Sequence, residues 1–215
     1  MSKSNKYGYS GVDIPTQAFK ANVGKFEPSE INELVADNLW TSFGQLELIE
    51  TQTVSNAVAD FISLQENVYN IHFFTFSDIH FGSQTEFGYR LSNDGGTSFE
   101  TGYDFANFRI TDDSGTSQRR STNQNTARLF GDIDNGGNSV GQGYMYLYGA
   151  SNSTKYTTST SHFVFENEGD RFCMEWGGQG YDHQEHISGI RFGASTSMSN
   201  MASATISLYG IRSYK

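Results

Sequence analysis

The feature that most constrains the fold of this chain is residues 69–99, where two runs of strand-forming residues precede a glycine-containing turn. The first run is rich in aromatic and β-branched residues, which need a core to cover them. The second run, residues 86–91, alternates polar and apolar side chains with the period of a half-buried β-strand. Asp94 and Gly95, in the turn that follows, tolerate the positive φ of a tight hairpin. This stretch therefore predicts strands that pack on a common core.

The same alternation of short strands and polar turns continues to the end of the chain, and no second helix is predicted after residue 43. Eleven strands without helical crossovers indicate an all-β fold, an antiparallel jelly-roll-like β-sandwich over residues 43–215. An immunoglobulin sandwich is disfavoured, because it has fewer strands and a Cys…Trp…Cys spacing that is absent here. Turns are predicted at residues 93–96, 112–115, 134–137 and 177–180. The predicted strands are residues 45–53, 58–63, 70–77, 86–92, 104–110, 126–130, 143–149, 156–165, 171–176, 187–192 and 204–211.

Residues 1–42 differ from the rest and are predicted to be an extended N-terminal arm followed by one short helix. Pro28 fits the first position of that helix, and a single apolar stripe precedes Asn38. A helix of about ten residues is not stable alone in water. We therefore expect this segment to attach to a partner protein, or alternatively to pack on its own sandwich. The residues expected to make these contacts are Tyr7, Tyr9, Ile14, Phe19, Phe26, Ile31, Leu34 and Val35.

The charge balance narrows the choice of partners. The chain has 24 acidic and 14 basic residues, a formal net charge of −10. Nucleic acids and anionic membrane surfaces repel such a protein, so neither is expected to bind it. No apolar run approaches the length of a membrane span, and the N-terminus lacks the apolar region of a signal peptide. We expect a protein made in the cytoplasm, with no membrane insertion.

The single cysteine, Cys173, excludes a disulfide framework within the chain. Strand alternation places Cys173 on the face opposite to Phe172 and Met174. A nucleophilic cysteine requires a base and an oxyanion site, and the sequence places neither beside it. Cys173 is therefore predicted to be a buried residue of a strand.

Two short segments resemble metal sites in part. Asp132 and Asp134 alternate as in a calcium loop, but the glutamate that closes an EF-hand is missing, so an acidic turn is favoured. His183 and His186 have a spacing that binds metal on a helix, but the glycines at residues 177–180 indicate a loop. We expect no metal and no cofactor.

The aromatic residues of two strands are the candidates for binding. Tyr144, Tyr146 and Tyr148 lie at period two and share one face of their strand. They can stack on sugar rings, or they can pack in the core or against another subunit. Trp176 joins them as a possible glycan or subunit contact. Glu175 beside it is one acid, whereas glycoside hydrolysis needs a pair, so no catalytic residue is predicted.

Four segments carry a family resemblance: KYGYSGVDIPTQAF (6–19), FEPSEINELVADNLWTSFGQLELIETQTVS (26–55), YRLSNDGGTSFETGYDF (89–105) and ATISLYGIR (204–212). In this order and spacing they resemble virion structural proteins of marine tailed bacteriophages, especially cyanophage-like ones. The likeness covers most of the chain and is tightest over residues 7–53. The family brings no catalytic residues.

The resemblance implies a non-enzymatic virion protein that is made in the host cytoplasm. A surface-exposed tail fibre or baseplate appendage, anchored by the N-terminal arm, is favoured, and a capsid decoration protein is the alternative. Its partners would be other virion proteins and further copies of itself, with a trimer as the leading expectation. A different class of function is a carbohydrate-binding or glycan-degrading module that recognises host surface glycans. A groove with exposed Trp or Tyr would favour that class.

Overall fold

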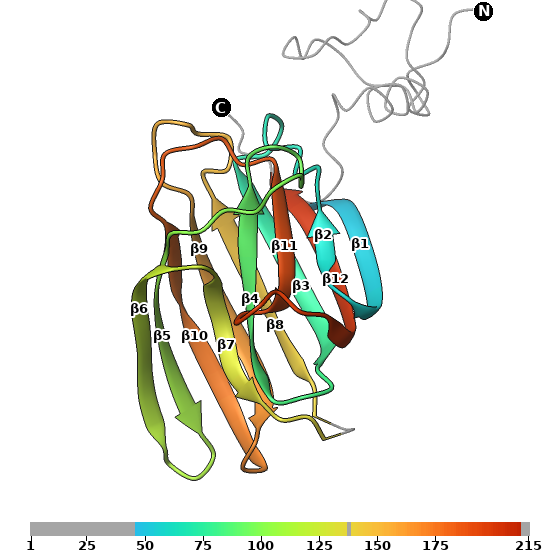
Figure 1. Ribbon diagram of the computed structural model, residues 1–215, viewed down its shortest axis with the longest axis vertical. Coiled ribbons are helices and arrows are strands. Elements are labelled where there is room, and N and C mark those ends of the chain that lie inside the picture. Colours follow the sequence, from blue (N-terminus) through green and yellow to red (C-terminus); the bar gives the residue numbers. More distant parts are fainter. Residues whose placement is uncertain (1–45, 137–138, 212–215) are drawn as a thin grey trace, which may run out of the picture. The chain divides into compact units, whose positions relative to one another are not determined.

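The structure, a computed structural model, describes residues 46–136 and 139–211, which contain β-strands and no helix (Figure 1). The predicted all-β class is confirmed. The predicted arm, its helix and the contact residues between Tyr7 and Val35 lie outside the described residues. Within the described ranges no helix is present that could cross a membrane. The strands are β1 (Leu46–Ala57), β2 (Ala59–Phe61), β3 (Ile71–His80), β4 (Thr85–Ser92), β5 (Tyr103–Thr111), β6 (Thr116–Gln124), β7 (Ala127–Ile133), β8 (Gly141–Tyr148), β9 (Thr158–Asn167), β10 (Arg171–Tyr181), β11 (Gly189–Ala194) and β12 (Met201–Ile211).

The strands form two antiparallel layers (Figure 1). The large sheet has the order β1-β12-β3-β8-β9-β10-β5-β6, and the small sheet has the order β2-β11-β4-β7. A single pair, Ile133 with Asn167, joins β7 to β9 and links the two sheets at one side. The chain passes between the layers several times, since β3 and β5 lie in the large sheet and β4 and β7 in the small one. The predicted sandwich is therefore confirmed.

Each of the eleven predicted strands corresponds to an observed one, and one strand was not predicted. β6 pairs with β5 along most of its length, but its sequence TSQRRSTNQ has no apolar residue to alternate. The predicted turn at residues 177–180 is wrong, because β10 continues to Tyr181. A Cβ on Gly177 would overlap the Asn107 side chain and the Ala106 carbonyl of β5. Glycine serves there for close approach between paired strands rather than for a turn.

The turn at residues 93–96 forms, but it does not close a hairpin. Gly95 and Gly96 have φ values of 69° and 87°. The carboxylate of Asp94 accepts hydrogen bonds from the Ser98 amide and hydroxyl and from the Ser92 hydroxyl, which lower the pKa of Asp94 to about 2. β4 pairs with β11 and β7, and β5 with β10 and β6. The predicted tight hairpin is therefore wrong, and the turn carries the chain from the small sheet to the large one.

Aromatic rings fill the apolar part of the interior. Phe192 of β11 lies at its centre and is fully buried. Its ring lies 5.1 to 6.1 Å from five other rings, those of Phe61, Phe74, Phe76, Phe87 and Tyr89. These rings come from both sheets, so the cluster holds the two layers together.

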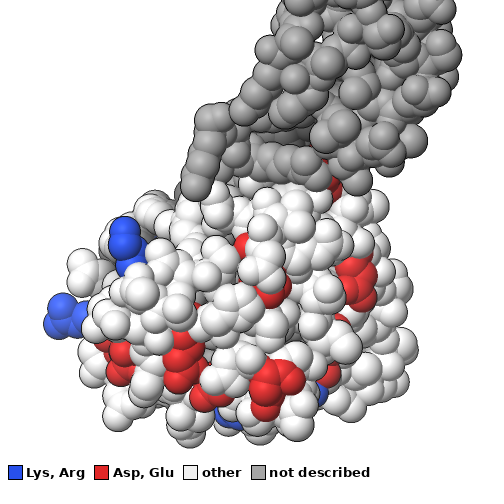
Figure 2. Space-filling view, turned by 90° about the horizontal axis from the view of Figure 1, so that it is seen from above, with Lys and Arg blue, Asp and Glu red and all other residues white. Residues whose placement is uncertain are grey.

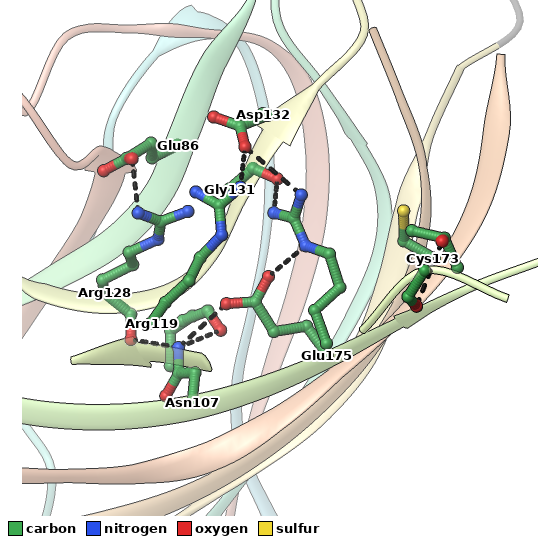
Figure 3. Close-up of polar contacts among 12 residues, drawn as sticks. Glu86, Asn107, Arg119, Arg128, Gly131, Asp132, Cys173 and Glu175 are labelled. Atoms are coloured by element: carbon green, nitrogen blue, oxygen red, sulfur yellow. Dashed lines mark hydrogen bonds and ion pairs between the residues drawn. The ribbon is translucent and has the colours of Figure 1, made fainter. Parts of the chain in front are cut away.

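The interior beneath β10 and β5 is polar instead (Figure 3). Glu175 is fully buried, and its carboxylate accepts hydrogen bonds from Arg109 Nε at 2.9 Å and from Asn107 Nδ2 at 3.2 Å. Arg109 also donates to the carboxylate of Asp132, at 3.2 Å, and to the carbonyl of Gly131. The last two residues belong to β7 of the small sheet. This ion network therefore ties β10 and β5 to the opposite layer.

Neutral side chains extend the same network toward β8. Gln179 donates to Asn107 and to Ser161, each at 3.1 Å, and accepts from Ser159 at 2.6 Å. Ser159 also hydrogen-bonds the hydroxyl of Tyr89, at 2.9 Å, on β4. Buried polar groups that find partners in this way hold one arrangement of the strands. The network thereby fixes β9, β10 and β5, whose other face is solvent-exposed.

Candidate functional site

The three tyrosines of β8 lie on the outer face of the large sheet, and the residues between them are buried in the core. Tyr144 is 41% exposed, and Tyr146 and Tyr148 are half-buried. Trp176 of β10, which is 36% exposed, lies on the same outer face, because its neighbours Glu175 and Gly177 face the interior network. The structure thus brings together all four residues predicted as glycan or subunit contacts.

The register of the sheet extends these residues into a continuous aromatic band. One row aligns Tyr209, Phe73 and Tyr146, and the next row aligns Tyr144, His162, Trp176 and Phe108. Neighbouring ring centroids in these rows are 4.7 to 6.5 Å apart. Tyr146 and Tyr148 stack at 6.2 Å with 17° between their planes. The band crosses six strands, from β12 to β5.

Two adjoining depressions open beside the band, with volumes of about 710 Å³ and about 750 Å³. The first lies between the β8 tyrosines and Trp176, and the second continues over β10, β5 and β6. Tyr148, Thr160 and Gly178 line both of them. Together they form what we call the aromatic groove, lined mainly by Tyr144, Tyr146, Tyr148, Trp176, Thr160, Thr158, Gly178, Gly180, Ala106, Asp104 and Arg120.

Small residues form the floor of the aromatic groove. Sheet pairing places Thr160, Gly178 and Ala106 side by side on β9, β10 and β5. The space above Gly178 is open, because a Cβ built there would meet only the Ser159 carbonyl, at 3.7 Å. Large rings on one side and small residues on the floor leave a depression in which a flat ring can lie beside Tyr148.

The groove offers stacking surfaces and hydroxyl groups, with few charges. Among the described residues that line it, Asp104 is the single carboxylate. The carboxylate of Asp104 accepts a hydrogen bond from the backbone amide of Asn123 at 2.9 Å. Glu175, the acid that neighbours Trp176 in sequence, points into the interior and contacts Arg109 instead. The described part of the groove therefore lacks the paired carboxylates of a glycoside hydrolase.

The remaining candidates lie elsewhere. Cys173 is buried, as predicted, and burial raises the pKa of its thiol. His183 Nδ1 lies 2.6 Å from Asp182 Oδ1 and His186 Nε2 lies 3.2 Å from Glu66 Oε1, so the two imidazoles contact different carboxylates in a loop. No group of three potential metal ligands occurs within residues 46–136 and 139–211.

The acidic turn proposed for Asp132 and Asp134 is wrong in its first half. Asp132 belongs to β7 and pairs with Arg109 and Arg119. Burial acts to raise the pKa of Asp132, but the guanidinium of Arg119, aided by Arg109, outweighs it, so this pKa lies below the ordinary value. Asp134 alone sits in the following loop, where it accepts hydrogen bonds from the Gly136 amide and the Ser139 hydroxyl. The two carboxylates therefore serve separate networks.

Several residues of the site were not predicted from the sequence. Phe73, Phe108, His162 and Tyr209 join the band, and Arg120 borders the groove on a strand that was itself missed. The period-two spacing along β8 or β10 could not reveal these residues, because they belong to other strands.

Comparisons of the chain with protein-family models, curated proteins and solved structures found no match.

Proposed function

We propose that this protein binds a saccharide chain in the aromatic groove without cleaving it. The observation that carries the proposal is the arrangement of Tyr148 and Trp176 around the open floor at Gly178. A pyranose ring has an apolar face of C–H groups and a rim of hydroxyls. Aromatic rings complement the face, and hydroxyl-bearing side chains such as Thr160 complement the rim.

The alternative use of these aromatics is packing against another subunit. An interface core of that kind is apolar and has few open spaces. The aromatic groove instead combines rings with threonine and tyrosine hydroxyls, and Tyr148 already hydrogen-bonds Thr160 at 3.3 Å. Two glycines of β10, Gly178 and Gly180, leave its floor open. Aromatic rings and hydroxyl groups together favour a ligand that has apolar faces and a polar rim, as a sugar does.

The resemblance to virion proteins of marine phages supplies a biological setting for this binding. We propose a surface-exposed appendage or fibre of the particle, held by its N-terminal arm, that contacts glycans of the host surface. A capsid decoration protein with the same groove is the second placement. This part of the proposal rests on the four resembling segments, whereas saccharide binding rests on the groove.

Groove variants test saccharide binding on an array of polysaccharides. We expect Trp176→Ala and Tyr148→Ala each to weaken binding about thirtyfold, since loss of a central aromatic anchor costs about 2 kcal/mol. Gly178→Val should abolish binding, because the valine side chain would occupy the open space above the floor of the groove. Affinity is measured by titration calorimetry with the best polysaccharide of the array.

Phe172→Ala is the matched control, because Phe172 lies on the same outer face of β10, is 64% exposed and does not line the groove. It should leave affinity unchanged. Thermal unfolding of each variant shows whether the fold is retained. Equal affinities of wild type, Gly178→Val and Trp176→Ala would contradict binding in this groove.

Removal of the arm tests the virion placement. From Leu46 onward the chain forms a compact unit of its own, so a chain without residues 1–26 should fold with nearly unchanged stability. We expect it to be absent from purified particles, as detected by mass spectrometry. A truncated chain that enters particles normally, or that unfolds, would show that the arm is not the anchor.

A further inference from the structure

Among the described residues that line the aromatic groove, Arg120 is the single arginine. It is exposed and lies on β6, directly beside Ala106 of β5, which in turn lies beside Gly178. Strand alternation directs its neighbour Arg119 inward to Asp132, so Arg120 faces the groove side of the sheet. Its guanidinium therefore borders the small-residue floor on the side opposite to Tyr146.

The side chain of Arg120 makes no hydrogen bond or ion pair with any residue of the described ranges. By contrast, Arg109, Arg119, Arg128, Arg171 and Arg191 each contact a carboxylate, and Arg90 donates to the hydroxyl of Thr126. Acidic residues outnumber basic ones in this chain, and they are spread over the end of the sandwich seen in Figure 2. An arginine that stays without a carboxylate partner in such a protein has its donors available to a ligand.

Asp104 is the acidic residue near Arg120 in the groove, and its charge has the opposite effect on an anionic ligand. It lies on the outer face of β5, two residues before Ala106, and its Oδ1 is directed to the Asn123 amide of β6. Its charge opposes an anion in the second depression, whereas Arg120 attracts one. The pair therefore gives two single changes with opposite expected effects on the same ligand.

We infer that the aromatic groove is selective for acidic glycans, with Arg120 pairing a carboxylate or sulfate group of a sugar whose neighbour stacks on Tyr148. The inference rests on the saccharide-binding function proposed above. It concerns the charges at the groove itself, Arg120 and Asp104, because salt screens the more distant acidic residues that give the net charge of −10. Arginine suits this role, because its planar donors match the oxygens of a carboxylate or sulfate in a bidentate fashion. Carboxylate and sulfate share the recognising chemistry, and the experiment separates them.

The test uses the full chain and polysaccharide pairs that share a backbone and differ in charge. One pair is polygalacturonate and its fully methyl-esterified form, and the other is κ-carrageenan and its desulfated form. We expect the wild type to bind the charged member of at least one pair about tenfold more tightly, as a charge-assisted contact provides. The pair that shows the difference identifies the group as carboxylate or sulfate.

Three variants locate the selectivity. Arg120→Gln should bind the charged and neutral members equally, because its neutral amide cannot form the charge-assisted contact, and Asp104→Asn should increase the preference for the charged member. Trp176→Ala should weaken both. If the wild type binds both members equally, or if Arg120→Gln keeps the preference, this inference is overturned while saccharide binding stands. If the wild type binds neither member of either pair nor any neutral polysaccharide, both proposals are overturned.

Discussion

Replacing Glu175 by glutamine is expected to destabilise the protein by about 3 to 5 kcal/mol, because it leaves the guanidinium of Arg109 buried with less compensation. The side chain of Arg109 is only 5% exposed, and Glu175 is its fully buried partner on the adjacent strand. Asp132 also contacts Arg109, which places the expected loss toward the lower end of that range. Urea unfolding followed by circular dichroism gives the free energy.

Glu168→Gln is the control for the loss of an acidic charge, since Glu168 is exposed in the loop between β9 and β10. It should change stability by less than about 0.5 kcal/mol. Replacing Arg109 by methionine in the Glu175→Gln background removes the uncompensated charge and should restore part of the loss. If Glu175→Gln itself stays within about 1 kcal/mol of the wild type, the buried ion network does not hold the sheets together as described.

Phe192→Ala is expected to cost about 3 to 5 kcal/mol, the range for truncating a buried phenylalanine. The ring contacts aromatic residues of both sheets, and its removal opens a cavity between them that rigid strands cannot collapse to fill. A domain has only about 5 to 15 kcal/mol of net stability, so this loss removes a large part of it. Thermal and urea unfolding measure the loss.

The exposed Phe172 provides the comparison, because Phe172→Ala removes the same ring from a solvent-exposed position. Phe192→Leu keeps most of the buried volume and should cost clearly less than Phe192→Ala. Equal effects of Phe192→Ala and Phe172→Ala would show that the aromatic cluster is not the centre of the core.

The strands could be predicted because their alternation is local. Tyr144, Tyr146 and Tyr148 reveal their common face by spacing alone, and the structure places them as expected. β6 could not be predicted, because an edge strand that pairs with one neighbour needs little apolar surface. Gly177 contributed to the wrong turn prediction at residues 177–180. The local sequence does not distinguish a glycine in a turn from a glycine that allows a neighbouring strand to approach closely.

The groove depends on sheet order, which local patterns do not encode. His162 lies beside Trp176 only because β9 pairs with β10, and Arg120 lies near Gly178 only because β6 follows β5 at the edge of that sheet. The inward direction of Glu175 follows from strand alternation, but its partner Arg109 comes from a strand 66 residues earlier. Such contacts become visible only when the register is known.

Saccharide binding in the aromatic groove can be observed directly in a crystal structure, or in a chemical-shift map on isotope-labelled protein, with the oligosaccharide that binds best on the array. We predict that the sugar lies on the outer face of the large sheet, with rings against Tyr148 and Trp176 and contacts to Thr160 and Gly178. Shift changes should be confined to β8, β9, β10, β5 and β6. A ligand found on the small sheet or in the loops, with these five strands unperturbed, would contradict it.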